Sequence, residues 1–178
     1  MTEGPSTPDT PPPDRRTFLL YGAAVLLVQL VLMAGVWISA PHNGGDNAGY
    51  VALAHALLEG LGYVEAWDPA TPLHTKYPPV FPALLAAAVA AGARTWVALK
   101  AIPAAATTAA VVLTYLWVAR RRDPFSGALV ALLLSAGSGL LWYSHWVLSD
   151  VPFLALTMLA LVALERAEAP SPPAWPRE

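Results

Sequence analysis

Two long apolar runs limit what this chain can fold into more than any other feature. Residues 18–38 and 96–118 each match the roughly 20 apolar residues that an α-helix needs to cross about 30 Å of hydrocarbon. The whole chain is 56% hydrophobic and only 12% charged, which is too little charge for the surface of a soluble domain of this size. We therefore predict an all-α, polytopic membrane protein.

Two further spans are predicted in the C-terminal half. Asp123 and Pro124 are residue types that favour the cap and the first position of a helix, and the apolar run that they begin continues to about residue 146. A last apolar run covers residues 151–164. Together with the two long runs, these segments predict about four transmembrane helices.

Two shorter segments are predicted to lie at the membrane surface. Residues 50–61 repeat apolar side chains at the spacing of one helix face, with polar residues on the opposite face. Residues 80–91 are apolar throughout, but a helix of that length rises only about 18 Å and cannot cross the bilayer. We expect two juxtamembrane helices on the outer face, with a re-entrant course as the alternative for the second.

Proline-rich segments flank this region. Residues 1–16 and 167–178 have too little apolar surface to pack, so we predict disordered tails around a transmembrane module at residues 17–166. Arg15 and Arg16 also resemble a twin-arginine export signal with a passable cleavage site after the apolar run. That run is longer than the apolar region of a typical signal, and more membrane protein follows it. We therefore predict an uncleaved first span.

The distribution of basic residues predicts the orientation. Cytoplasmic segments of membrane proteins carry an excess of lysine and arginine. With four spans, the arginines near both ends of the chain and those at residues 120–122 all fall on one side. We predict a multi-pass protein of the plasma (inner) membrane, with a cytoplasmic N-terminus and with Asp46, Lys76 and Asp150 on the outer face.

Two carboxylates at the outer ends of predicted helices are the main candidates for a functional site. Asp46 precedes the first juxtamembrane helix and Asp150 precedes the last span. A charge at the membrane boundary is costly unless water, a cation or a substrate compensates it. Each carboxylate could instead be only a helix cap, Lys76 an ordinary interfacial lysine, and His74 a solvated interfacial residue. We predict that Asp46, Lys76 and Asp150 converge on one outward cavity, with Tyr50 and His74 nearby.

The order of these motifs resembles that of a known family. A Leu-Leu-Glu-Gly-Leu-Gly-Tyr segment ends at Tyr63, a Lys-Tyr-Pro-Pro run starts at Lys76, and a Leu-Ser-Asp-Val-Pro segment contains Asp150. With Asp46 after the first span, this arrangement is similar to the GT-C fold glycosyltransferases, in the bacterial group related to protein O-mannosyltransferases and lipid A aminoarabinose transferases. The resemblance covers about residues 18–166.

The resemblance implies an integral membrane enzyme that passes a sugar from a polyprenyl-phosphate donor to a lipid, glycan or protein acceptor on the outer face. It implies that Asp46 is the catalytic base, because a carboxylate can take the proton of an acceptor hydroxyl. Lys76 would contact the donor phosphate and offset its charge. Asp150 would orient substrate or help to hold a divalent metal ion, and the other metal ligands stay unknown. The remaining implied substrate-binding residues are Tyr50, His74 and Tyr77.

Members of this family have many more spans, so we expect this chain to be a partial form that is inactive alone. The missing spans would come from the rest of a longer protein or from a partner chain. The alternative from a different class is a non-catalytic four-span protein, such as a transporter subunit or an assembly partner.

The net charge of -2 argues against a nucleic-acid partner, and without cysteine there is no thiol nucleophile or thiolate metal site.

Overall fold

A computed structural model describes residues 14–42 and 45–168 of the chain. Over these residues it contains seven α-helices and no strand, so the all-α prediction is confirmed. The helices are α1 (Arg15–Val36), α2 (Asn47–Leu58), α3 (Val80–Ala90), α4 (Trp96–Arg121), α5 (Pro124–Ser135), α6 (Ser138–Tyr143) and α7 (Asp150–Glu168). Most of both predicted disordered tails lies outside the described residues, and the tail residues that are described lie at the ends of α1 and α7.

Of the helices described, α1 and α4 are long and apolar enough to cross a membrane, and they coincide with the two long apolar runs of the sequence. Their surroundings differ, because only 11% of the apolar window of α1 is buried inside the protein, against 44% for α4. On α1, Leu19, Leu20 and Leu27 are each more than half exposed. Most of the apolar surface of α1 is therefore not covered by other described residues.

The prediction of one uninterrupted helix over residues 124–146 is wrong. Residues 124–146 form α5 and the short α6, because Gly137 between them has an extended backbone conformation. The Gly-Ser-Gly sequence that starts at Gly137 gives the physical reason, since glycine is the poorest helix former after proline. α5 has 12 residues, and a helix of that length rises only about 18 Å and does not reach across a bilayer.

The remaining predicted segments are helical. α7 covers the predicted residues 151–164 and extends at both ends to include Asp150, Glu165 and Arg166. With these charges, α7 is not among the helices apolar enough to count as candidate spans, so the four-span arrangement stays a prediction. α2 and α3 correspond to the two segments predicted to lie at the membrane surface.

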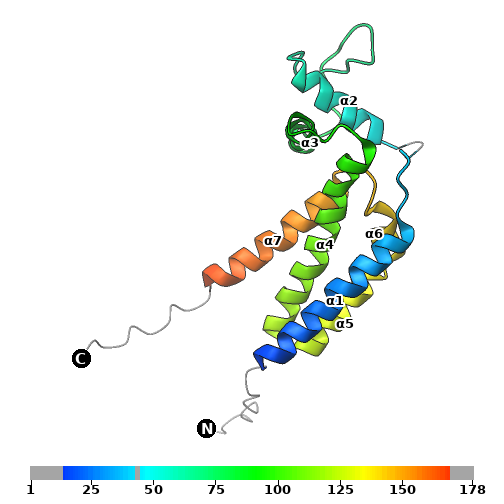
Figure 1. Cartoon of the computed structure of the whole chain (residues 1–178). Coiled ribbons are helices and arrows are strands. Elements are labelled where there is room, and N and C mark those ends of the chain that lie inside the picture. The colour runs from blue at the N-terminus through cyan, green and yellow to red at the C-terminus, as the bar shows by residue number, and fades with distance from the viewer. Residues whose placement is uncertain (1–13, 43–44, 169–178) are drawn as a thin grey trace.

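α4 is the centre of the helical bundle, and α1, α5 and α7 pack against it (Figure 1). α1 meets α4 through Phe18 and Tyr115, whose rings lie 5.3 Å apart, and the Tyr115 hydroxyl donates to the Phe18 carbonyl. α1 also meets α5, where Ser135 Oγ donates to the buried Gln29 Oε1 at 2.7 Å. Because Phe18 is near the start of α1 and Tyr115 near the end of α4, these two helices run in opposite directions.

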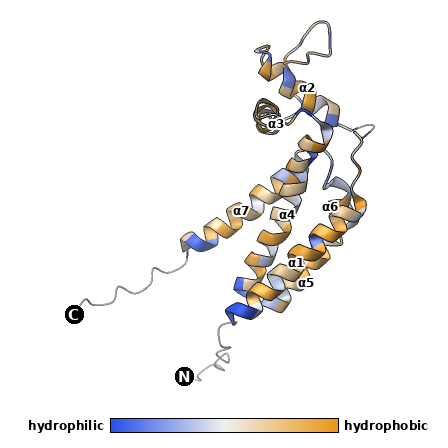
Figure 2. Cartoon of the chain, viewed as in Figure 1, coloured by the Kyte–Doolittle hydropathy of each residue, from blue (hydrophilic) through white to orange (hydrophobic). Residues whose placement is uncertain are grey.

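The two ends of the bundle differ. At the basic end, which holds the start of α1 and the ends of α4 and α7, Arg121 Nε lies 3.5 Å from Glu165 Oε1 and so joins α4 to α7. Figure 2 shows hydrophilic residues at the start of α1 and the end of α7, with mostly hydrophobic helix beyond them. Near the opposite end, Lys100 is buried, and its Nζ donates to the carbonyl oxygens of Ile38, at 2.7 Å, and Ala40. Lys100 thus holds the segment that follows α1 against α4.

α2 and α3 lie together beyond the end of the bundle that is opposite the basic end (Figure 1). They share a hydrophobic core with the start of α4 and with the segment before α7. Tyr50 of α2, Phe81 and Leu85 of α3, Leu99 of α4, and Val147 are buried members of this core. The fold thus gathers at one end the chain segments that carry the candidate site residues.

Close contact between α4 and α5 requires glycine at position 127. A Cβ atom there would lie 2.6 Å from the Cβ and 2.9 Å from the Cα of Ala119, so the two helices would have to move apart. We expect Gly127→Ala to lower the free energy of unfolding by about 1–3 kcal/mol, the usual cost of overpacking. Thermal unfolding in detergent measures this loss.

Gly139→Ala is the matched control for this prediction. A Cβ atom at position 139 would meet nothing within 4 Å, and alanine is the better helix former. The control should therefore unfold at the same temperature as the unchanged protein or slightly above it. An equal loss of stability in both variants would contradict the packing account.

Candidate functional site

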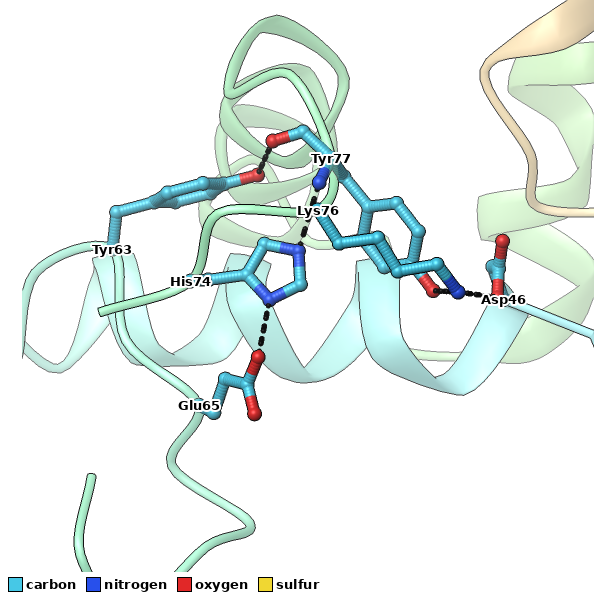
Figure 3. Close-up of polar contacts among 6 residues, drawn as sticks. All are labelled: Asp46, Tyr63, Glu65, His74, Lys76 and Tyr77. Atoms are coloured by element: carbon cyan, nitrogen blue, oxygen red, sulfur yellow. Dashed lines mark hydrogen bonds and ion pairs between the residues drawn. The ribbon is translucent and has the colours of Figure 1, made fainter. Parts of the chain in front are cut away.

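Asp46 occupies the N-cap position of α2, but its side chain makes no capping hydrogen bond. Instead, Lys76 Nζ donates to Asp46 Oδ1 at 3.0 Å and to the Tyr77 hydroxyl at 3.0 Å (Figure 3). The alternative that the Asp46 side chain serves only as a helix cap is therefore wrong. Lys76 is not an unpaired interfacial lysine either. We call Asp46, Lys76 and Tyr77 the acid–lysine cluster.

The members of the acid–lysine cluster favour one another's charged or protonated forms. The pKa of the Asp46 carboxyl lies below its ordinary value, because Tyr77 and Lys76 form hydrogen bonds with the carboxylate. The hydrogen bonds of Lys76 to Tyr77 and Asp46 raise the pKa of its ammonium group. The pKa of Tyr77 is raised, first by burial and then by its hydrogen bond to Asp46. The side chains of Lys76 and Asp46 are 65% and 42% exposed, so a ligand from outside can reach them.

Tyr50 supports the acid–lysine cluster from α2. Its ring stacks on that of Tyr77 with the centroids 4.4 Å apart, and its hydroxyl forms a hydrogen bond of 2.8 Å with Ser149 Oγ. Gly49 allows this approach, because a Cβ atom there would already lie 3.3 Å from the Tyr77 ring. Tyr50 is buried and its hydroxyl is engaged, so in this structure it supports Tyr77. That Tyr50 contacts substrate stays a prediction.

The segment before α7 is fastened to the start of α2. Asn47 is buried, and its Oδ1 accepts a hydrogen bond from the Val147 backbone N–H at 2.7 Å. Together with the bond between Tyr50 and Ser149, this brings the end of the segment beside α2. Asp150 follows directly as the first, exposed residue of α7. That its carboxylate shares a ligand with Asp46 stays a prediction.

His74 does not have the surroundings expected of a substrate contact. Its side chain is only 2% exposed. Its Nδ1 lies 2.9 Å from Glu65 Oε1, and its Nε2 accepts a hydrogen bond from the Tyr77 backbone N–H at 3.0 Å (Figure 3). Because both ring nitrogens are engaged and the side chain is buried, the alternative of a solvated interfacial residue is wrong. That His74 takes part in substrate binding stays a prediction.

Sequence reasoning did not single out three residues that complete this arrangement. They are Asn47, Ser149 and Glu65. Asn47 forms a hydrogen bond with Val147, Ser149 with Tyr50, and Glu65 with His74. Asn47 and Ser149 are direct neighbours of the two predicted acids, and that adjacency is the signal that could have found them. Glu65 lies in an irregular polar connection, where no periodic pattern marks it.

The arrangement offers no obvious metal centre. Within residues 14–42 and 45–168, no group of three or more His, Cys, Asp or Glu side chains is placed to hold a metal ion. The divalent ion expected near Asp150 therefore has no such set of ligands in this part of the chain.

Comparisons with known proteins found no relative: no family model, no curated protein and no solved structure matches this chain. The similarity to the GT-C glycosyltransferases therefore rests on the order of its motifs alone.

Proposed function

We propose that this chain is part of a membrane glycosyltransferase that transfers a sugar from a polyprenyl-phosphate donor to an acceptor at the outer face of the plasma membrane. The acid–lysine cluster is the observation that supports this most. It combines an exposed carboxylate, an exposed ammonium group and a hydroxyl at the end of the bundle away from the basic helix ends. A proton acceptor and a cation that binds phosphate are the two groups that such a transfer uses.

The ion pair between Lys76 and Asp46 suggests how donor binding would prepare the base. In the structure, Lys76 Nζ donates a hydrogen bond to Asp46 Oδ1 at 3.0 Å. The phosphate of an incoming donor would compete for the ammonium group, because phosphate oxygens are strong acceptors of charge-assisted hydrogen bonds. Departure of Lys76 removes one of the contacts that lower the pKa of Asp46. The carboxylate then keeps its hydrogen bond with Tyr77 and is a better proton acceptor.

In the transfer itself, the acceptor hydroxyl gives its proton to Asp46 while its oxygen attacks the anomeric carbon of the sugar. The bond between that carbon and the phosphate oxygen breaks, and its electron pair leaves with the polyprenyl phosphate. Lys76 stabilises the negative charge that gathers on the departing phosphate. An enzyme at a membrane surface is suited to such a donor, since the polyprenyl chain stays in the lipid.

The apolar surface of the bundle supports the membrane location. Monomeric soluble proteins rarely expose contiguous apolar patches of more than a few hundred Å², whereas α1, α5 and α7 all carry exposed large apolar side chains. The most exposed are Leu19, Leu20, Leu27, Val31, Phe125, Leu133, Phe153, Leu156 and Leu164. A bilayer around these helices would cover this surface, with the arginine-rich end in the cytoplasm.

Labelling of single cysteines tests this orientation. The chain has no cysteine of its own, so each introduced thiol is unique. We expect an impermeant reagent added outside intact cells to label Asp46→Cys and Asp150→Cys. Arg121→Cys should react only after the membrane is permeabilised, because it lies at the basic end. Labelling of position 121 from outside would contradict the orientation.

The polar residues of α4 do not favour the alternative of a transport pathway. Thr107, Thr108 and Thr114 each donate their hydroxyl to the backbone carbonyl four residues earlier in the same helix. Such back-bonding satisfies the hydroxyl within its own helix.

Membranes that contain the complete protein should move label from a polyprenyl-phosphate sugar to an acceptor. A donor that stays intact beside its acceptors would contradict the proposed function.

A further inference from the structure

Lys76 and Tyr77 belong to the connection between α2 and α3, which has no helix or strand to fix its course. Residues 59–79 contain only an isolated bridge, between Val64 and Leu73. The Lys76 side chain is largely exposed, and its hydrogen bonds reach Asp46 and Tyr77. An exposed, flexible side chain cannot hold the backbone that carries it, so the position of Lys76 depends on other contacts.

Side chains of the same connection hold the Tyr77 backbone from both sides. Its N–H donates to His74 Nε2 at 3.0 Å, and its carbonyl accepts from the Tyr63 hydroxyl at 2.8 Å (Figure 3). The first bond fixes the peptide group that joins Lys76 to Tyr77, and the second fixes the next one. The two bonds together set the directions in which the Lys76 side chain and the Tyr77 ring leave the chain.

The bond to Tyr77 also defines the tautomer of His74. A backbone N–H can only donate, so Nε2 must accept and carries no proton. The proton of the neutral ring is then on Nδ1, where it is donated to Glu65 Oε1 at 2.9 Å. A carboxylate on one ring nitrogen selects which nitrogen carries the proton. Glu65 thus selects the tautomer that can hold Tyr77.

We propose that His74 is a positioning residue of the donor site, whose Nε2 holds the Tyr77 backbone and thereby places the Lys76 ammonium group for the donor phosphate. The identity of the donor rests on the proposed function. The placement of Tyr77 by His74 can be measured in this chain without any donor. The positioning role of His74 and the proposed function can therefore be tested separately.

Two variants of similar size separate the functions of the two ring nitrogens. His74→Gln places an amide oxygen near the position of Nε2, so it keeps an acceptor for the Tyr77 N–H and loses the bond to Glu65. His74→Asn places its amide near the position of Nδ1, so it keeps a donor for Glu65 and leaves the Tyr77 N–H without an acceptor. A general structural need for the histidine predicts equal damage in both.

Hydrogen exchange of the Tyr77 amide measures the positioning directly in the purified 178-residue chain, without any activity. We expect the unchanged chain and His74→Gln to exchange at similar rates. His74→Asn should exchange up to about tenfold faster, the change that corresponds to the loss of one typical hydrogen bond. Equal exchange in all three proteins would overturn the proposal. If His74→Asn prevents folding, His74→Gln still tests the proposal. Faster exchange of the Tyr77 amide in His74→Gln than in the unchanged chain would overturn the positioning role.

Kinetics of the complete protein supply the second readout. We expect His74→Asn to raise the donor KM and to lower kcat/KM by about 10- to 100-fold, since displacement of a reacting group by about 1 Å costs that much. His74→Gln should stay within about threefold of the unchanged protein. Equal kinetics for Gln and Asn would contradict the positioning role. If the Tyr77 amide responds as expected but no protein transfers sugar, the proposed function fails and the positioning role stands.

Discussion

Replacement of Asp46 by asparagine in the complete protein should lower sugar transfer by about 10²–10⁴-fold, the usual contribution of a general base. Asparagine has nearly the same shape, and its amide oxygen can still accept the hydrogen bond from Lys76 that Asp46 accepts at 3.0 Å. The start of α2 should also be unharmed, because the Asp46 side chain makes no capping bond. We therefore expect a low kcat with an unchanged unfolding temperature and an unchanged or lower donor KM.

Glu59→Gln is the matched control for Asp46→Asn. It also removes one carboxylate charge from an end of α2, but Glu59 is an exposed residue at the opposite end of this helix. The control should retain transfer within about threefold, as expected of a surface change away from the reacting groups. Full activity of Asp46→Asn would remove the catalytic assignment of Asp46 even if the fold is right.

Replacement of Lys76 by methionine should lower transfer by about 10²–10³-fold, the cost of removing one group that stabilises developing negative charge. In contrast to Asp46→Asn, this variant should also raise the donor KM, because the lysine meets the phosphate before the reaction as well as during it. The Lys76 side chain is 65% exposed, so its loss should not affect folding. Initial rates at varied donor concentration separate the two parameters.

Arg94→Met is the matched control for Lys76→Met. Arg94 is another exposed cation, in the connection between α3 and α4. Its removal lowers the positive charge by the same amount without touching the acid–lysine cluster. We expect its donor KM to stay within about threefold of the unchanged protein, as for other surface substitutions. If both lysine and arginine variants raise the donor KM equally, the phosphate responds only to net charge, and the assignment of Lys76 fails.

Local sequence patterns predict most of the helices. The apolar runs at residues 18–38 and 96–118 correspond to α1 and α4, and the short run at 80–91 corresponds closely to α3, because length and apolarity are properties of each segment. The error at residues 124–146 has a local cause as well. Apolar residues on both sides of a break in the helix give no sign of that break. The Gly-Ser-Gly sequence at Gly137 interrupts the helix in spite of the apolar pattern.

The candidate site depends on contacts that no local pattern contains. Asp46 and Lys76 are 30 residues apart in the chain, and Tyr50 and Ser149 are 99 residues apart. The order of the motifs suggests that such segments meet, but it does not show which atoms pair. For the same reason His74 looks like a possible ligand in the sequence, whereas the structure buries it between Glu65 and the Tyr77 backbone.

The proposed function requires the acid–lysine cluster to contact the phosphate end of a polyprenyl-phosphate donor. Photo-crosslinking with a polyprenyl phosphate that carries a diazirine next to the phosphate tests this contact. We expect adducts at residues 46–50 and 74–77, lost when unlabelled polyprenyl phosphate is in excess and weakened by Lys76→Met. Adducts confined to the exposed apolar surface of α1, or adducts that excess polyprenyl phosphate does not remove, would contradict the claim.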